Sequence, residues 1–177
     1  MSAAVLDARR PDAGAAPVTL SELRARFRDR KAALLEQFRV ARPTAPAAMR
    51  LIRSLCKHVD ETLLTLWRHT GMPDDAALLA VGGYGRGELF PHSDVDVLIL
   101  LPPGHTETTD SLRSAIEAFI TACWDSGLEI GSSVRTVDEC VAMALSDVTV
   151  QTALLESRYL CGSRRVFNTF RLSLIHI

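Results

Sequence analysis

The segment from Leu78 to Leu101 constrains the fold of this chain more than any other part of its sequence. A short apolar run, Leu78 to Val81, leads into a glycine-rich stretch, and a second apolar run follows Ser93 and reaches Leu101. Short apolar runs bounded by glycine and proline are typical of buried β-strands. The segment therefore predicts a strand, a turn at Gly82 to Gly87 (the glycine turn) and a second strand.

Apolar residues with helical spacing flank this segment. Between residues 19 and 71 they recur at three, four or seven positions, and Pro43 and Pro46 interrupt the pattern, which predicts two helices in an antiparallel hairpin. Thr19 and Glu22 have the spacing of a capping box at the start of the first helix. Beyond the second strand the pattern predicts an extended segment at 128–136 and helices at 112–123, 138–145 and 148–160. This order of elements predicts a mixed α/β or α+β architecture.

The two ends of the chain are expected to lie outside this fold. Residues 1–18 are rich in Ala, Pro, Asp and Arg without periodicity, which predicts a disordered tail. Residues 172–177 match the translation of an adapter used in preparing sequencing libraries, and we expect them to be an artefact. The domain predicted for residues 72–171, which follows the hairpin at 19–71, is then expected to be truncated.

Composition narrows the classes of partner. The 20 basic and 21 acidic residues give a net charge of -1, so no overall field favours nucleic acid or an anionic membrane as partner. The longest strongly apolar run, Val97 to Leu101, is far shorter than a membrane span. His58 and Glu61 lack a second histidine at metal-binding spacing, and we expect them as a partly exposed pair. The protein is expected to be cytosolic, with four widely separated, reduced cysteines at Cys56, Cys123, Cys140 and Cys161.

The glycine turn does not fit the two most familiar phosphate-binding motifs. No Gly-Lys-Ser/Thr follows it, which excludes a P-loop, and Glu88 stands where a dinucleotide fingerprint has its third glycine. What remains is a set of glycines whose backbone amides can approach an anion closely. Asp94 and Asp96 follow after a short interval, so the sequence predicts a phosphate cradle beside two carboxylates.

The two aspartates have the spacing of neighbours on one face of a strand. Residues i and i+2 of a strand share a face, so Asp94 and Asp96 lie together while Val95 and Val97 point into the core. Two adjacent carboxylates repel each other unless a cation neutralises them, and their oxygens suit Mg²⁺. A pair of such ions stabilises the attacking and leaving oxygens at phosphorus. The pattern therefore predicts phosphoryl or nucleotidyl transfer.

Glu129 is the candidate for a third carboxylate. It stands between Leu128 and Ile130 in the extended segment, and this apolar, acidic, apolar pattern would aim its side chain at the same site from a neighbouring strand. A role as metal ligand or general base is expected. The alternative is a glutamate that faces outward on the surface.

Three groups of residues resemble the nucleotidyltransferase domain of the bacterial PII uridylyltransferase/uridylyl-removing enzymes. They are Gly82-Gly83-Tyr84-Gly85-Arg86-Gly87-Glu88-Leu89 with Pro91, Ser93-Asp94-Val95-Asp96, and Gly127-Leu128-Glu129 with Ser133-Val134-Arg135-Thr136. The resemblance covers about Leu20 to Arg171. The glycine and Asp-x-Asp motifs are shared by the wider DNA polymerase β-like nucleotidyltransferase superfamily. The sequence Gly-Gly-Tyr-Gly-Arg-Gly-Glu-Leu is specific to a much narrower group of proteins. The resemblance implies an α+β fold in which helices flank a small mixed sheet.

The resemblance also implies a reaction and a set of roles. In this family UMP is transferred from UTP to a tyrosine hydroxyl of the PII nitrogen-regulatory protein, with release of pyrophosphate. Carried over by motif, Asp94 and Asp96 would bind Mg²⁺, as two ions, and Glu129 would complete the acidic set. The triphosphate would be held by Gly82, Gly83 and Ser93.

Two side chains of the glycine turn have more than one expected role. Arg86 would either neutralise phosphate charge or form a structural ion pair with Glu88. Tyr84 is expected to pack beneath the turn rather than stack on a base.

Other functions stay open at this stage. Full-length members of the family also carry a hydrolase domain that removes UMP and domains that sense glutamine, and this chain is expected to lack both. A different nucleotidyltransferase, such as an ATP-dependent adenylyltransferase, is the first alternative. A non-catalytic module, in which the hairpin binds a partner and the acidic strand is vestigial, is the second.

Overall fold

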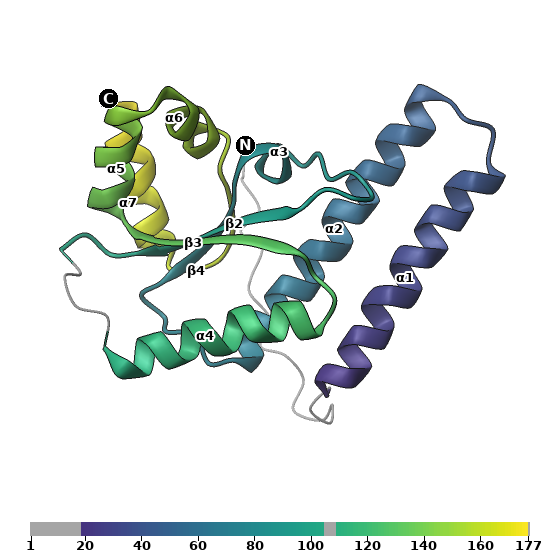
Figure 1. Cartoon of the computed structure of the whole chain (residues 1–177). Helices are drawn as coiled ribbons and strands as arrows, with labels where there is room; N and C mark the ends of the chain where they lie inside the picture. The colour runs from purple at the N-terminus through teal and green to yellow at the C-terminus, as the bar shows by residue number, and fades with distance from the viewer. Residues whose placement is uncertain (1–18, 105–108, 177) are drawn as a thin grey trace, which may run out of the picture.

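The computed structural model describes residues 19–104 and 109–176 (Figure 1). The predicted tail at 1–18 lies outside the described residues. The helices and strands follow the order α1 (Leu20–Val40), α2 (Ala45–His69), β1 (Ala77–Ala80), α3 (Gly82–Gly85), β2 (Val95–Leu101), α4 (Asp110–Asp125), β3 (Ile130–Thr136), α5 (Val137–Ser146), α6 (Val148–Leu155), β4 (Arg158–Gly162) and α7 (Arg164–Ile175).

The four strands form one mixed sheet in the order β3-β2-β1-β4. β1 is antiparallel to both β2 and β4, whereas β2 and β3 are parallel, with Val95 opposite Ile130. Figure 1 shows α4 on one face of this sheet and α5, α6 and α7 on the other. The predicted α+β architecture, a small mixed sheet flanked by helices, is confirmed.

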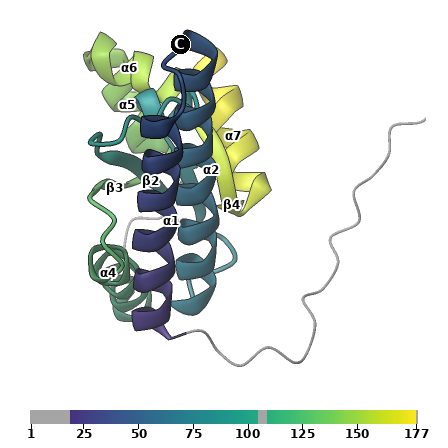
Figure 2. The ribbon, with the colours of Figure 1, turned by 90° about the vertical axis from the view of Figure 1, so that its right-hand side faces the viewer.

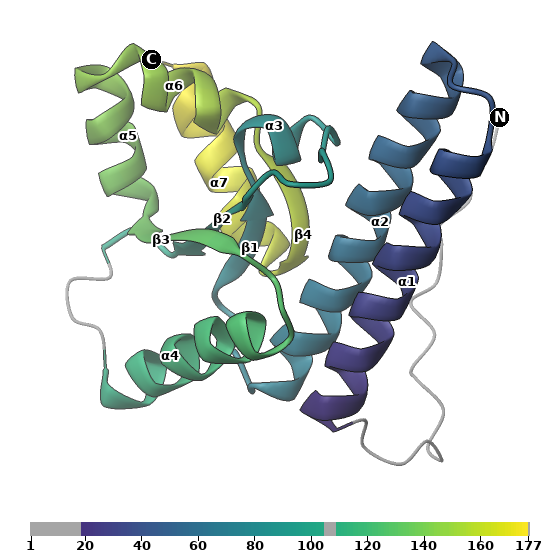
Figure 3. The same ribbon diagram turned by 45° about the vertical axis from the view of Figure 1, so that its right-hand side comes forward.

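The predicted helical hairpin is also present. Thr19 and Glu22 form the expected capping box at the start of α1, and Thr44 caps α2, which has proline in its first turn. The two helices run side by side along their length (Figure 2), and α2 lies between α1 and the sheet (Figure 3). Trp67 of α2 packs edge-on against Phe119 of α4, with ring centroids 5.4 Å apart. The hairpin therefore shares a hydrophobic core with the sheet.

Strand β2 is buried on both faces. Val95, Val97 and Ile99 face the core that includes α2 and α4, whereas Leu98 and Leu100 face the core that includes α5 and α7. A strand covered on both sides needs apolar residues at every position, which explains the nearly continuous apolar run. Asp96 is the exception within β2, and it is exposed.

The part of the chain after α5 differs from the prediction. The helix expected over 148–160 ends at Leu155, and Arg158–Gly162 forms the edge strand β4 on β1. Helix α7 had not been predicted. The first four of the residues expected to be an artefact continue it as far as Ile175, and Leu174 is buried against the same core as Phe170.

Two further features concern membranes and cysteines. None of the helices within the described ranges is long and apolar enough to cross a membrane. All four cysteines are free and three of them are buried, and their reduced state stays a prediction.

Candidate active site

The glycine turn begins at the end of β1 as a single helical turn, α3. The Val81 amide donates to the Asp96 carbonyl oxygen at 3.1 Å, so the start of the turn is tied to β2. Gly82 has φ +55°, a left-handed conformation that glycine adopts without strain. The amides of Gly82 and Gly83 open α3, where N–H groups have no carbonyl partner within the helix. These two amides thus have no carbonyl partner within α3, and their role in holding an anion stays a prediction.

The two aspartates lie at the amino-terminal end of β2, next to the glycine turn. Val95 and Val97 are buried, while Asp94 and Asp96 are exposed, which is the predicted alternation. Partial burial, together with the negative charge of Asp94, raises the pKa of the Asp96 carboxyl group. The two carboxylates on this face therefore repel each other, and a bound cation would relieve the repulsion.

A glycine on the neighbouring strand makes room for Asp96. Gly131 is opposite Asp96 in the parallel register of β2 and β3. An ideal Cβ on Gly131 would lie 2.5 Å from Asp96 Oδ1, closer than real Cβ contacts allow. The carboxylate therefore occupies space that a side chain at position 131 would fill. We had not predicted Gly131 as a site residue, although a glycine inside a strand is a recognised signal of close approach.

Glu129 extends the same register by one residue. Its carbonyl oxygen accepts a hydrogen bond from the Val95 amide at 2.9 Å, which places Glu129 beside Asp94. By strand alternation its side chain belongs to the face that carries Asp94 and Asp96. It is exposed, and no group of three or more His, Cys, Asp or Glu side chains in the described ranges is close enough to hold a metal. The structure thus pairs the two aspartates and leaves Glu129 next to them, outside a closed ligand set.

The donors present fit Mg²⁺. They are carboxylate oxygens, which Mg²⁺ prefers, and Mg²⁺ commonly uses one or two protein carboxylates and takes its other ligands from substrate phosphate and water. Asp94 and Asp96 supply that number. Both side chains are exposed, and the absence of a side chain on Gly131 leaves room for the carboxylate of Asp96.

Ser93 is exposed in the loop just before the aspartates. Its amide donates to the Phe90 carbonyl oxygen at 3.1 Å, which folds the loop into a turn. Ser93 and Glu129 also border a cavity of about 110 Å³. Val95 and Leu128 line this cavity and belong to the core on the α2 side, so it lies behind the face that carries Asp96.

Arg86 forms ion pairs with two glutamates. Its Nε lies 3.0 Å from Glu88 Oε2 and its Nη1 lies 2.5 Å from Glu156 Oε2. These hydrogen bonds raise the pKa of the guanidinium. The ion pair with Glu88 had been one of its two expected roles, and Glu156 is an additional partner. An incoming phosphate would therefore compete with two carboxylates for Arg86.

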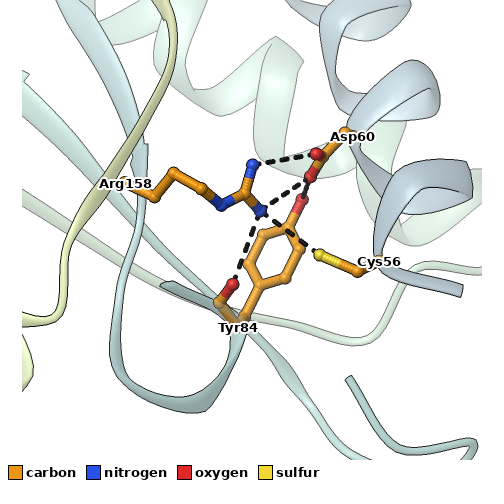
Figure 4. A network of polar contacts seen from close by, with 4 residues as sticks. All are labelled: Cys56, Asp60, Tyr84 and Arg158. Atoms are coloured by element: carbon orange, nitrogen blue, oxygen red, sulfur yellow. Dashed lines mark hydrogen bonds and ion pairs between the residues drawn. The ribbon is translucent and has the colours of Figure 1, made fainter. Parts of the chain in front are cut away.

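Tyr84 packs beneath the glycine turn, as expected. Its ring is buried, and its hydroxyl group donates to Asp60 Oδ1 at 2.5 Å. Burial and the charge of Asp60 raise the pKa of the phenol well above its usual value, so the hydroxyl stays protonated. Arg158 lies over the ring, 5.3 Å from its centroid (Figure 4). Tyr84 therefore anchors the turn, and its buried ring cannot stack on the base of a nucleotide.

Comparison with known proteins decides what kind of domain carries these residues. Residues 56–141 match the nucleotidyltransferase domain family, and all seven candidate site residues fall inside that range. The chain contains a nucleotidyltransferase domain. The match begins within α2, so the second helix of the hairpin contributes to the domain.

Curated relatives of this nucleotidyltransferase domain have a consistent name. The chain is 59% identical over 121 residues to a bifunctional uridylyltransferase/uridylyl-removing enzyme of Ralstonia nicotianae, a match that covers 68% of the chain and 14% of the relative. It is 49% identical over 158 residues to the enzyme of the same name from Burkholderia thailandensis, covering 89% of the chain and 18% of the relative. The chain thus spans less than a fifth of the length of these relatives.

Proposed function

We propose that the domain transfers UMP from UTP to a tyrosine hydroxyl of the PII nitrogen-regulatory protein and releases pyrophosphate. The observation that carries the proposal is the position of Asp94 and Asp96, which lie on one face of β2 where the Val81–Asp96 hydrogen bond joins the strand to the glycine turn. The name shared by the relatives supports uridylyl transfer. The proposal adds to this the PII protein as acceptor, UTP as nucleotide donor and Mg²⁺ as the metal ion.

Each group in the site has a defined part in this reaction. Asp94 and Asp96 hold Mg²⁺, and the amides of Gly82 and Gly83 together with Ser93 hold the triphosphate. Bound there, Mg²⁺ would offset charge on the attacking and leaving oxygens.

The bonds that form and break follow from an in-line displacement. The tyrosine oxygen forms a bond to the α-phosphorus of UTP, and the bond from that phosphorus to the bridging oxygen breaks, so pyrophosphate leaves. The hydroxyl proton passes to a base, for which Glu129 is the candidate, because it lies beside Asp94 with an exposed carboxylate. Arg86 is paired with Glu88 and Glu156, and it would contact phosphate oxygens by exchanging one of these carboxylates.

The four free cysteines fit a reducing compartment. The cytoplasm is accordingly the proposed location, where UTP is available as the nucleotide donor.

A transfer assay tests the function directly. The chain is incubated with Mg²⁺, a PII protein and UTP labelled at the α-phosphate, and the expected result is label on a tyrosine of the PII protein with one pyrophosphate released per label. A PII protein with that tyrosine changed to phenylalanine is the control. Transfer from α-labelled ATP but not UTP would indicate an adenylyltransferase instead. Absence of transfer with either nucleotide would contradict the proposal.

A further inference from the structure

The glycine turn is contacted from outside the motif by two residues that lie at least seventy positions later in the chain. Glu156, which caps α6, and Arg158, the first residue of β4, lie against three consecutive residues of the turn. The backbone of Gly85 packs so closely on the Glu156 carbonyl oxygen that a Cβ would overlap it. Arg86 forms its second ion pair with the Glu156 carboxylate, 2.5 Å away.

Arg158 joins the glycine turn to helix α2. Its Nη2 donates to the Tyr84 carbonyl oxygen at 3.4 Å, and its guanidinium makes a two-pronged ion pair with Asp60, at 2.8 Å and 3.1 Å. Figure 4 shows this guanidinium beside the Tyr84 ring, with contacts to the Asp60 carboxylate, to the Tyr84 carbonyl oxygen and to the Cys56 sulfur, which lies 3.3 Å from Nη2. Three segments far apart in sequence therefore meet at one side chain.

This ion pair is set apart from ordinary surface pairs by its geometry and burial. The Arg158 and Asp60 side chains are only 33% and 23% exposed, compared with 55% and 45% for the Arg30–Glu61 pair. The Nε of Arg158 is buried without a hydrogen-bond partner, a cost that the other contacts of the guanidinium must offset. Buried ionic groups add little net stability compared with apolar packing, and in some proteins they instead fix one arrangement of the elements that they join.

The two ends of the glycine turn are thus held by different means. Its start is tied to β2 by the hydrogen bond from Val81 to Asp96, a continuation of the sheet. Its far side is held by Glu156 and Arg158. Arg158 and Glu156 contact Tyr84, Gly85 and Arg86, so removal of this second attachment should loosen the turn while the first attachment keeps Asp94 and Asp96 in place.

We propose that Asp60, Glu156 and Arg158 are positioning residues that hold the glycine turn over the Asp94–Asp96 face. As far as nucleotide binding is concerned, this inference rests on the function proposed above. Arg158 acts through the Tyr84 carbonyl oxygen and ring, Asp60 fixes the Arg158 guanidinium, and Glu156 fixes Arg86. None of the three is expected to touch the nucleotide.

The test uses conservative substitutions and a matched control. Arg158→Lys keeps the charge but cannot reach Asp60 and the Tyr84 carbonyl oxygen together. Asp60→Asn removes the charge partner, and Glu156→Gln, the mildest change, removes only the ion pair with Arg86. The control is Glu61→Gln, because Glu61 neighbours Asp60 on α2 and forms the exposed ion pair with Arg30, 3.2 Å away.

The first readout needs no nucleotide. Amide hydrogen exchange is measured at Gly85 to Glu88, whose N–H groups donate to carbonyl oxygens within residues 81–84. We expect exchange at these amides to be about tenfold faster or more in Arg158→Lys and Asp60→Asn. The loss of a hydrogen bond to a charged group changes the equilibrium constant for local opening by about this factor. Exchange in β2 and in the rest of α2 should stay as in the wild type, and Glu61→Gln should change nothing at the turn.

The second readout is the dissociation constant of UTP in the presence of Mg²⁺. It should rise about tenfold in Arg158→Lys and Asp60→Asn, and less in Glu156→Gln, while Glu61→Gln matches the wild type.

The outcomes separate this proposal from the proposed function. Faster exchange confined to the turn supports the positioning role, even if the wild type binds no UTP, which would contradict the proposed function alone. Unchanged exchange at the turn in all three variants would overturn the positioning role, and so would equally faster exchange throughout the sheet, which marks a general loss of stability. If Arg158→Lys or Asp60→Asn does not fold, Glu156→Gln decides between these outcomes.

Discussion

Two glycines of the glycine turn should respond to alanine in opposite ways. An ideal Cβ on Gly85 overlaps the Glu156 carbonyl oxygen and lies 3.0 Å from that of Ala80, and both are backbone atoms that a rotamer change cannot move. An ideal Cβ on Gly83 has no neighbour nearer than 3.6 Å, and Gly83 is not among the glycines with positive φ. Alanine at position 85 must therefore displace backbone, whereas alanine at position 83 fits.

The size of each effect follows from this geometry. Overpacking of a tight site costs about 1–3 kcal/mol, and in a chain of this length each kcal/mol lowers Tm by about 2–4 °C, so Gly85→Ala should lower Tm by about 2–12 °C. Gly83→Ala restricts the unfolded chain without strain in the folded one. It should raise the free energy of unfolding by about 0.4–1 kcal/mol.

The assay is thermal and urea unfolding followed by circular dichroism, with UTP titrations of each variant. Gly83→Ala should be as stable as the wild type or more so, yet bind UTP less tightly, because its methyl group keeps phosphate oxygens away from the amide. A wild-type Tm for Gly85→Ala would refute the close approach of the turn to Glu156. Destabilisation of Gly83→Ala beyond that of Gly85→Ala would refute the geometry of the turn itself.

Three further predictions concern the aspartate pair and the hairpin. Gly131→Ala should leave the fold intact, because the Asp96 carboxylate can swing away from the new methyl group. The same movement should weaken Mg²⁺-dependent UTP binding. The neighbouring control, Ser132→Ala, should bind UTP as the wild type does. The pKa of Asp96 is raised, so the folded protein binds the proton of this carboxyl group more tightly than the unfolded chain does. Without Mg²⁺, the free energy of unfolding should therefore fall as pH rises from about 4 through the pKa of Asp96 in the folded protein. Asp96→Asn should remove this pH dependence in urea titrations. Burial lowers the pKa of His58, whose Nε2 hydrogen-bonds to the Phe27 carbonyl oxygen at 3.0 Å. The free energy of unfolding should therefore fall as pH drops below about 6.5, where His58 of the unfolded chain takes up a proton. An equal loss of stability in acid for His58→Asn would show that His58 is not its source.

Local sequence patterns were sufficient to predict the centre of the candidate site. The turn at Gly82, the strand that starts after Asp94 and the extended segment around Glu129 each depend on short-range signals, namely glycine, alternation and a flanking apolar pair. Their meeting follows because β2 and β3 pair in parallel with Val95 opposite Ile130. The α1–α2 hairpin could be predicted for the same reason, since helical periodicity and caps are local.

The features that sequence reasoning missed all depend on contacts between distant segments. Residues 148–160 have apolar spacing that suits a continuous helix, but pairing with β1 converts Arg158–Gly162 into an edge strand. Arg158 finds Asp60 ninety-eight positions away, a partner that no spacing rule identifies. His58 was expected to be partly exposed, but α1 covers it, and its ring stacks on Phe27 at 4.9 Å.

The account depends most directly on whether Asp94 and Asp96 hold the metal that binds UTP. The decisive measurement is the Tm of the wild type, of Asp94→Asn/Asp96→Asn and of the control Asp74→Asn/Asp75→Asn, with and without UTP and Mg²⁺. The control removes two adjacent, exposed acids before the start of β1, at the end of that strand away from the glycine turn, so the change in net charge is the same.

UTP at 100 times its Kd adds about 2.7 kcal/mol, so with Mg²⁺ the wild type and the control should each gain about 5–11 °C. The site variant should gain nothing with UTP and Mg²⁺ together, while its fold stays intact. An equal gain in the site variant, or a gain in the wild type that does not need Mg²⁺, would contradict the central claim.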